Sequence, residues 1–135
     1  MAKRTRVAFV CVHNSCRSQM AEAIGRFLAG DRLECFSAGT MVKDRIDPDA
    51  VRLIAERYGV DMEAVQRPKL LDELPPVDVV VTMGCNVSCP HVPCRHREDW
   101  GLQDPTWRGD EAFHAVIDAI EGKVKALAER VGAAE

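Results

Sequence analysis

The sequence has few aromatic residues, no long apolar run and little net charge. Among its 135 residues are two tryptophans, four phenylalanines and one tyrosine, Tyr58. No uninterrupted apolar run approaches the ~18 residues of a membrane-spanning helix. The net charge of −3 argues against a nucleic-acid-binding surface and against a basic membrane-binding face. The basic N-terminal residues lead into a strand-length run and not into a signal peptide, so we expect a cytoplasmic protein without nucleic-acid or membrane partners.

Cysteine is the residue type in excess, with six copies. The length fits one domain over residues 1–135, at ~150 residues per domain, and allows a hydrophobic core that needs neither a disulfide nor a metal. Structural disulfides are therefore not expected in a cytoplasmic protein of this size. The cysteines instead indicate catalytic, redox or metal-binding chemistry.

Apolar runs of strand length alternate with amphipathic helices along the chain. The predicted strands are residues 6–12, 33–38 and 77–83, with a weaker one at 98–102. The predicted helices are residues 18–29, a helix that follows an Asp47 cap and ends at Gly59, and a last helix capped by Asp110. This alternation predicts an α/β domain with a mostly parallel sheet, in which the residues just past each strand gather at one edge. Cys11, Cys85 and Asp104 occupy such places.

The segment between the first predicted strand and helix has the form Cys-x5-Arg-Ser, from Cys11 to Ser18. Backbone N–H groups in a loop before a helix make an anion site, and the same field favours the thiolate of Cys11 as a nucleophile. Arg17 adds a planar pair of donors for a tetrahedral oxyanion. The alternative is a chance Cys and Arg pair at a strand–helix junction. The predicted oxyanion-binding residues are Val12, His13, Asn14, Ser15, Cys16, Arg17 and Ser18.

Four segments resemble the low-molecular-weight protein tyrosine phosphatase superfamily, and within it the thioredoxin-coupled arsenate reductases. They are CVHNSCRSQMAE at residues 11–22, SAGT at 37–40, VVVTMG at 79–84 and WGLQDP at 100–105. The resemblance covers nearly the whole chain and implies a single α/β domain, a four-stranded parallel sheet with helices on both faces. It also implies that Asp104 is the general acid, because the oxygen that leaves a tetrahedral centre must take up a proton.

The resemblance also bears on potassium. Some reductases of this kind bind potassium through an acidic residue beside positions that match Asn14, Glu22 and Ser37. Residues 67–69 of this chain, where that acid would stand, are Arg-Pro-Lys. The sequence therefore speaks against a potassium site.

A second cysteine-rich stretch, with Cys85, Cys89 and Cys94, follows the third predicted strand. Because Cys85 is expected at the same sheet edge as Cys11, we interpret Cys11, Cys85 and Cys89 as a disulfide relay, with Cys94 as the alternative outward thiol. A zinc site made by the three later cysteines and either His91 or His96 is the rival interpretation, although the spacing matches no common zinc pattern. Cys35 is expected in the core, and Cys16 as a packing residue or a protective disulfide partner of Cys11.

Three functions compete for these residues. The first is an arsenate reductase that recycles through its own cysteines with thioredoxin as reductant, and that needs no cofactor or resident metal. The second is a low-molecular-weight protein tyrosine phosphatase, and the third a zinc-binding regulatory module. The phosphatases usually carry tyrosines directly after the acid loop, where this chain has Thr106 and Trp107, and a hydrolase has no use for Cys85 and Cys89. Arsenate reduction, with weak phosphatase activity as a possible by-product, is the prediction.

Overall fold

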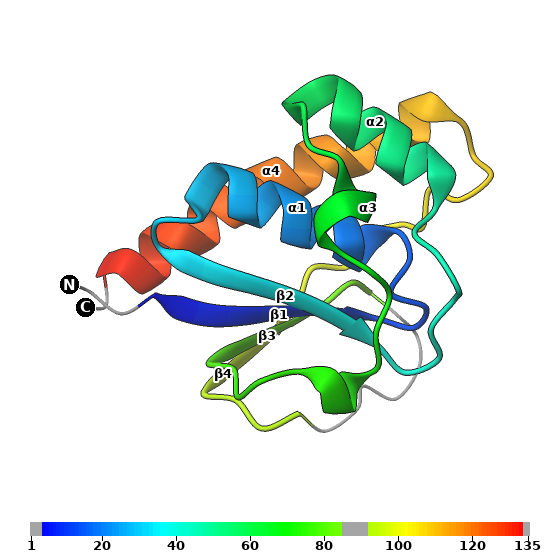
Figure 1. The fold of residues 1–135 in the computed structure, drawn as a ribbon. Helices are drawn as coiled ribbons and strands as arrows, with labels where there is room; N and C mark the ends of the chain where they lie inside the picture. The colour runs from blue at the N-terminus through cyan, green and yellow to red at the C-terminus, as the bar shows by residue number, and fades with distance from the viewer. Residues whose placement is uncertain (1–3, 85–91, 134–135) are drawn as a thin grey trace.

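The computed structural model describes residues 4–84 and 92–133 (Figure 1). The elements are β1 (Thr5–Cys11), α1 (Arg17–Ala29), β2 (Leu33–Gly39), α2 (Pro48–Tyr58), α3 (Met62–Val65), the 3-10 helix η1 (Leu71–Glu73), β3 (Val79–Thr82), β4 (His96–Asp99) and α4 (Asp110–Ala133). The strands form one sheet in the order β2-β1-β3-β4, and every ladder is parallel. The expected four-stranded parallel α/β fold is confirmed.

The strand register brings the carboxyl ends to one edge of the sheet. Cys11 pairs with Gly39 of β2, and Val10 pairs with Thr82 of β3. β1 and β3 are the two inner strands, and their alternate side chains face two apolar layers. The loops that follow β1, β3 and β4 therefore start close together, which is the geometry that parallel sheets use for ligand sites.

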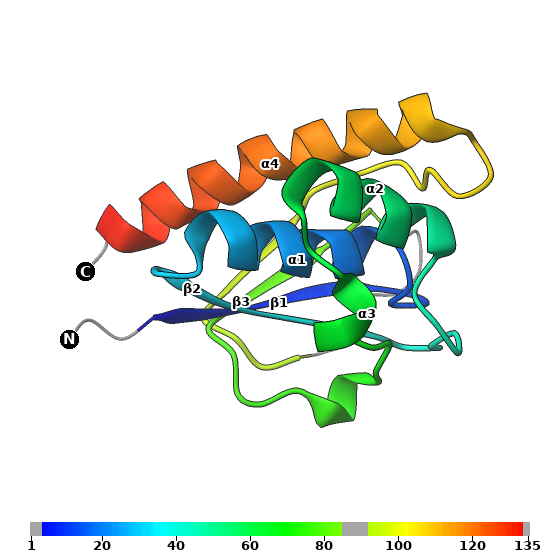
Figure 2. The ribbon, with the colours of Figure 1, turned by 45° about the horizontal axis from the view of Figure 1, so that its top comes forward.

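The two faces of the sheet are covered unequally. α1, α2 and α4 lie together on one face, as Figure 2 shows, and enclose the main core. On the other face, Ala8, Val10 and Val80 are buried under η1 and short loop segments. Among the described residues, helical elements thus cover both faces: α1, α2 and α4 lie on one, where Met62 of α3 joins the main core, and the 3-10 helix η1 lies on the other. The side chains over that second face are Leu71, Leu74, Val77, Val92 and Cys94.

The predicted N-cap and C-terminal glycine of α2 are confirmed, whereas the predicted N-cap of α4 is wrong. The Asp47 carboxylate accepts hydrogen bonds from the amides of Asp49 and Ala50, and Gly59 ends α2 in a left-handed conformation (φ 69°). Asp110, expected to cap the last helix, is instead its first residue. Its carboxylate is drawn to Arg52 of α2, with N–O distances of 2.8 and 3.1 Å, and so binds the neighbouring helix instead of its own first turn.

The fourth strand also differs from its expected range of residues 98–102. β4 begins earlier, at His96, and ends at Asp99, because Gly101 turns the chain with a positive φ of 59°. Glu98 ties β4 to α4, as its carboxylate accepts hydrogen bonds from Arg130 at 3.0 and 3.1 Å and from the Trp100 indole at 2.8 Å. In the described part of the chain, no helix is long and apolar enough to cross a membrane.

Candidate active site

The loop of residues 12–16 joins β1 to α1 at the carboxyl edge of the sheet. Asn14 has a left-handed backbone (φ 49°), which asparagine tolerates better than most residues. Gly39 lets β2 approach the loop, because a Cβ there would come within 2.6 Å of the Val12 carbonyl oxygen. Cys16 occupies the N-cap position of α1, and among the described residues no side chain caps that helix. The N–H groups of its first turn are therefore available to an anion.

The carbonyl groups of this loop face away from the site. The Val12 oxygen accepts hydrogen bonds from the amides of residues 40 and 41, the His13 oxygen from residue 43, and the Ser15 oxygen from residue 47. In a trans peptide the N–H group points opposite to the carbonyl. The N–H groups of residues 13, 14 and 16 therefore point away from residues 40–47, in the arrangement that an oxyanion requires.

Cys11 and Ser18 meet at the floor of the loop. The Cys11 sulfur lies 2.8 Å from the Ser18 hydroxyl oxygen, and both residues are buried. The Asn14 side-chain amide donates to the same hydroxyl oxygen at 2.8 Å. The Asn14 amide uses the Ser18 oxygen as an acceptor, so the one hydroxyl hydrogen of Ser18 is available to point at the sulfur, although either atom can be the donor in the contact with Cys11. A hydroxyl in this position can donate a charge-assisted hydrogen bond to an attacking sulfur.

Arg17 spans the site at the start of α1. Its Nη1 donates to the carbonyl oxygens of Met83 and Leu102, at 2.8 and 2.7 Å. These contacts join α1 to the segments that follow β3 and β4. Nε and Nη2 have no hydrogen-bond partner among the residues that the structure describes, so this edge of the guanidinium can bind an oxyanion through two parallel hydrogen bonds.

Asp104 lies on the exposed segment after β4. Its carboxylate accepts hydrogen bonds from the Thr106 hydroxyl at 2.6 Å and from the Thr106 amide at 3.0 Å. Partial burial by itself would raise the pKa of Asp104. The two hydrogen bonds and the positive charges of Arg17 and Lys43 outweigh burial, so the pKa is lowered. Asp104 is therefore a carboxylate at neutral pH.

The two other cysteines near the loop are buried thiols. Burial, followed by the negative charges of Asp47 and Asp104, raises the pKa of Cys16. Burial, with the charge of Glu22, raises the pKa of Cys35 on β2 to about 12. Both therefore stay protonated at neutral pH and pack in the core, as expected for Cys35 and for the packing role of Cys16.

Two expected relay residues, Cys85 and Cys89, lie outside the described residues. Cys94, the alternative outward thiol, is half-buried over the second face of the sheet. His96, one of the two histidines of the zinc interpretation, lies 3.0 Å from the Glu98 carboxylate. Within residues 4–84 and 92–133, no group of three or more His, Cys, Asp or Glu side chains could hold a metal ion.

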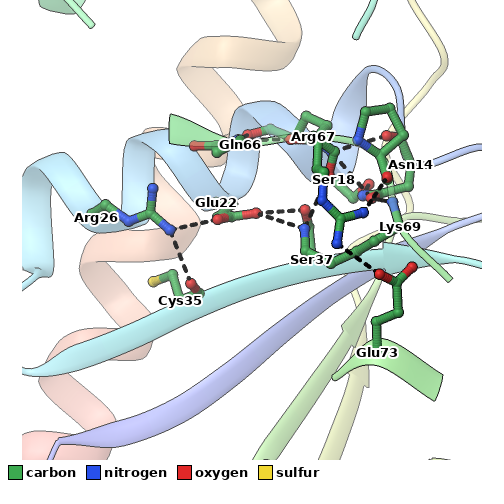
Figure 3. A network of polar contacts seen from close by, with 12 residues as sticks. Asn14, Ser18, Glu22, Arg26, Cys35, Ser37, Gln66, Arg67, Lys69 and Glu73 are labelled. Carbon is green, nitrogen blue, oxygen red and sulfur yellow. Dashed lines mark hydrogen bonds and ion pairs between the residues drawn. The ribbon is translucent and has the colours of Figure 1, made fainter. Parts of the chain in front are cut away.

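A second layer of polar side chains supports the loop, and sequence reasoning missed it (Figure 3). Gln19 is fully buried, and its amide donates to the backbone and side-chain oxygens of Asn14 at 3.0 and 3.1 Å. Gln66 in turn donates to the Gln19 side chain at 2.7 Å. The backbone amide of Lys69 donates to the Asn14 side-chain oxygen at 2.9 Å. The one feature of the sequence that could have indicated this layer is Gln19, a polar residue on the buried side of an amphipathic helix.

Residues 6–135 match the family described as low molecular weight phosphotyrosine protein phosphatase. Arsenate reductase 1 of Staphylococcus epidermidis is 33% identical over 135 residues, which cover 97% of this chain and 100% of that protein. Arsenate reductase of Brevibacillus brevis is 35% identical over 134 residues, covering 96% of this chain and 98% of that protein.

Solved structures with similar folds include an arsenate reductase in the phosphate binding state. It has a TM-score of 0.83 and 31% identity, and the match covers 94% of this chain and 98% of that one. A thioredoxin-dependent arsenate reductase of Corynebacterium glutamicum has a TM-score of 0.77 and 32% identity, covering 99% of this chain and 65% of that one.

Proposed function

Because this chain belongs to the low molecular weight phosphotyrosine protein phosphatase family, we propose that it uses the Cys11–Ser18 loop to reduce arsenate to arsenite. The observation that carries the proposal is the contact of 2.8 Å between Cys11 and Ser18 at the base of an uncapped helix N-terminus. This contact supports a nucleophilic role for Cys11 beside an oxyanion site. The similarity to arsenate reductases over the whole chain favours arsenate as the oxyanion.

The first chemical step follows from these positions. The loop N–H groups and the free edge of Arg17 bind the arsenate oxygens, and the Cys11 thiolate attacks arsenic. A sulfur–arsenic bond forms, an arsenic–oxygen bond breaks, and the leaving oxygen departs as water after it takes a proton from Asp104. Bound arsenate offsets the positive charge of Arg17, which raises the pKa of Asp104 from its lowered value in the free enzyme and favours the protonated acid.

The second step needs another thiol and two electrons. In the proposed relay, Cys85 attacks the Cys11 sulfur, the pair of electrons of the sulfur–arsenic bond passes to arsenic, and arsenite leaves. Cys89 then attacks Cys85 and frees Cys11, and a reduced thioredoxin removes the resulting disulfide. One contact supports the nearness of Cys85: Arg17 binds the carbonyl of Met83, two residues before it.

Phosphate-ester hydrolysis by the same loop is the second candidate, because the loop can bind any tetrahedral oxyanion. The side chains argue against phosphotyrosine as the main substrate. Tyr58 lies on α2 and is hydrogen-bonded to Glu121 of α4, and Trp107 is 93% exposed beyond the acid loop. No described tyrosine thus lines the site. We therefore expect phosphatase turnover to be weak beside arsenate reduction. A cytoplasmic location, where thioredoxin is reduced, belongs to the same proposal.

The test is a coupled assay with arsenate, thioredoxin, thioredoxin reductase and NADPH, followed by peptide mapping after one turnover. With the wild-type protein, the coupled system is expected to consume NADPH only when arsenate is present. Cys11→Ser should abolish this activity, Cys85→Ser should release almost no arsenite, and Cys89→Ser should accumulate a Cys11–Cys85 disulfide. If Cys94→Ser blocks recycling and Cys89→Ser does not, Cys94 is the outward thiol. Turnover of a phosphate ester without any arsenate reduction would refute the proposal, and so would a tightly bound zinc ion found by mass spectrometry.

A further inference from the structure

A buried carboxylate lies on α1 beneath the loop. Glu22 is 3% exposed, and both of its oxygens are in use. Oε1 accepts a hydrogen bond of 2.6 Å from the Ser37 hydroxyl, and Oε2 accepts one of 2.5 Å from Arg26. The Lys69 ammonium lies 3.9 Å from Oε1. A buried carboxylate is costly unless charges and hydrogen bonds compensate it, and these partners supply that compensation at Glu22.

The two cations beside Glu22, Arg26 and Lys69, come from different segments and differ in exposure. Arg26 comes from the next turn of the same helix, and its side chain is 45% exposed. Lys69 comes from the segment between α3 and η1, and its side chain is 18% exposed. Of these two ion pairs, only the one with Lys69 ties a distant segment to α1. Burial lowers the pKa of Lys69, and the charge of Glu22 opposes that shift.

The backbone of Lys69 reaches the catalytic loop. Its N–H donates to the Asn14 side-chain oxygen at 2.9 Å, and its carbonyl accepts from the Gly39 amide at 2.9 Å. Asn14 in turn donates to Ser18, and Ser18 contacts the Cys11 sulfur. Figure 3 shows Asn14, Ser18 and Lys69 in this arrangement. An unbroken series of hydrogen bonds therefore leads from the residue that carries the ammonium to the thiol.

We propose that Lys69 is a positioning residue for Cys11, in which the ammonium acts as a built-in counter-ion of Glu22. The ion pair holds the backbone of Lys69 against Asn14, and so keeps Asn14 in its left-handed conformation and the Ser18 hydroxyl directed at the sulfur. No metal cation is required at this place, because Lys69 and Arg26 already supply positive charge to Glu22. The inference rests on the proposed function only in taking Cys11 as the nucleophile.

The test compares Lys69→Met, which keeps most of the side-chain stem and all of the backbone, with Lys69→Arg, which keeps the charge. The readout is the rate of Cys11 alkylation by iodoacetamide against pH, followed by mass spectrometry of the Cys11 peptide. Lys69→Met is expected to move the midpoint of this profile to higher pH and to slow alkylation at pH 7 by about 3- to 10-fold, the effect of weakening one hydrogen bond to the sulfur. Lys69→Arg should restore most of the wild-type profile.

The control is Lys123→Met, which removes an exposed lysine from α4 and should leave the profile unchanged. In steady-state assays, Lys69→Met should lower kcat more than it raises the KM for arsenate. If Lys69→Met does not fold, the double variant Glu22→Gln with Lys69→Gln removes both charges together and should show the same shifted profile. A wild-type alkylation profile in Lys69→Met, or in the double variant, overturns the inference. Absence of arsenate reduction in the wild type overturns the proposed function and leaves the alkylation result standing.

Discussion

Ser18→Ala tests the contact on which the chemistry of the site depends. The substitution removes the hydroxyl that lies 2.8 Å from the Cys11 sulfur and changes no other atom of the loop. Hydrogen bonds to charged groups contribute about 1.5–3 kcal/mol. Losing one is therefore expected to slow Cys11 alkylation at neutral pH by about 10- to 150-fold, at 1.36 kcal/mol for each tenfold change.

The same substitution has a separate cost in stability. The Asn14 side-chain amide donates to the Ser18 oxygen, and both residues are fully buried. Ser18→Ala leaves that donor without its acceptor, which costs about 1–3 kcal/mol of unfolding free energy. Activity and stability are thus both expected to fall, and a control is needed to separate them.

The assay measures Cys11 alkylation at pH 7 and the urea midpoint on the same samples. Thr5→Val is the matched control, because it removes a buried hydroxyl from β1 at the end of the strand opposite Cys11. We expect Thr5→Val to lower stability without slowing alkylation, and Ser18→Ala to do both. If Ser18→Ala alkylates Cys11 at the wild-type rate, the hydroxyl does not stabilise the thiolate, and the reasoning is wrong.

Three further predictions concern Arg17, Asp104 and Glu98. Arg17→Lys keeps the charge but loses the planar pair of donors, so kcat/KM for arsenate should fall by ~100-fold or more; an unchanged value would make Arg17 purely structural. Asp104→Asn should slow the first chemical step by ~100-fold or more in rapid-quench experiments while arsenate affinity changes little; weaker binding with an unslowed step would refute its role. At Glu98, burial would raise the pKa, but hydrogen bonds from Arg130, His96 and Trp100 lower it to about 2 in the folded protein. The resulting stability, on the order of 1–2 kcal/mol after allowance for solvent screening, is present above pH ~4.5 and lost as the pH falls toward 2, and Glu98→Gln should flatten that part of the urea-midpoint profile.

The parts of the site that are local in sequence could be predicted, and the parts that depend on distant contacts could not. Cys11, Arg17 and Ser18 fall within one strand–loop–helix segment, so their spacing alone indicates an anion site. The parallel-sheet rule then brought the segment after β3 to the same edge, and Arg17 does bind Met83 there. The rule needs only strand order and direction, which the apolar pattern supplies.

The second layer of polar side chains behind the loop could not be predicted from the sequence. Gln66 binds Gln19 of α1 across 47 residues of sequence, and Lys69 binds Asn14 of the loop across 55, through hydrogen bonds that no periodicity encodes. The start of α4 is a similar case. Asp110 is a good N-cap residue by local rules, but Arg52 on a neighbouring helix draws its carboxylate away. Local propensity decides such positions only where no partner from elsewhere in the fold competes.

The two faces of the sheet bury very different amounts of apolar side chain, and we expect them to differ in the free energy that local opening costs. On the face with α1, α2 and α4, the buried side chains belong to the main core, so we expect opening there to cost much of the global free energy of unfolding. On the other face, Ala8, Val10 and Val80 are covered by partly buried side chains, among them Cys94, and the adjoining edge strand β4 has only four residues. We therefore expect the cover over these three side chains to open at a lower free-energy cost than the packing under the α-helices. If the proposed relay uses Cys94 as its outward thiol, its disulfide exchange takes place at this more easily opened cover, and the oxyanion site can stay assembled while the reducing equivalents are renewed.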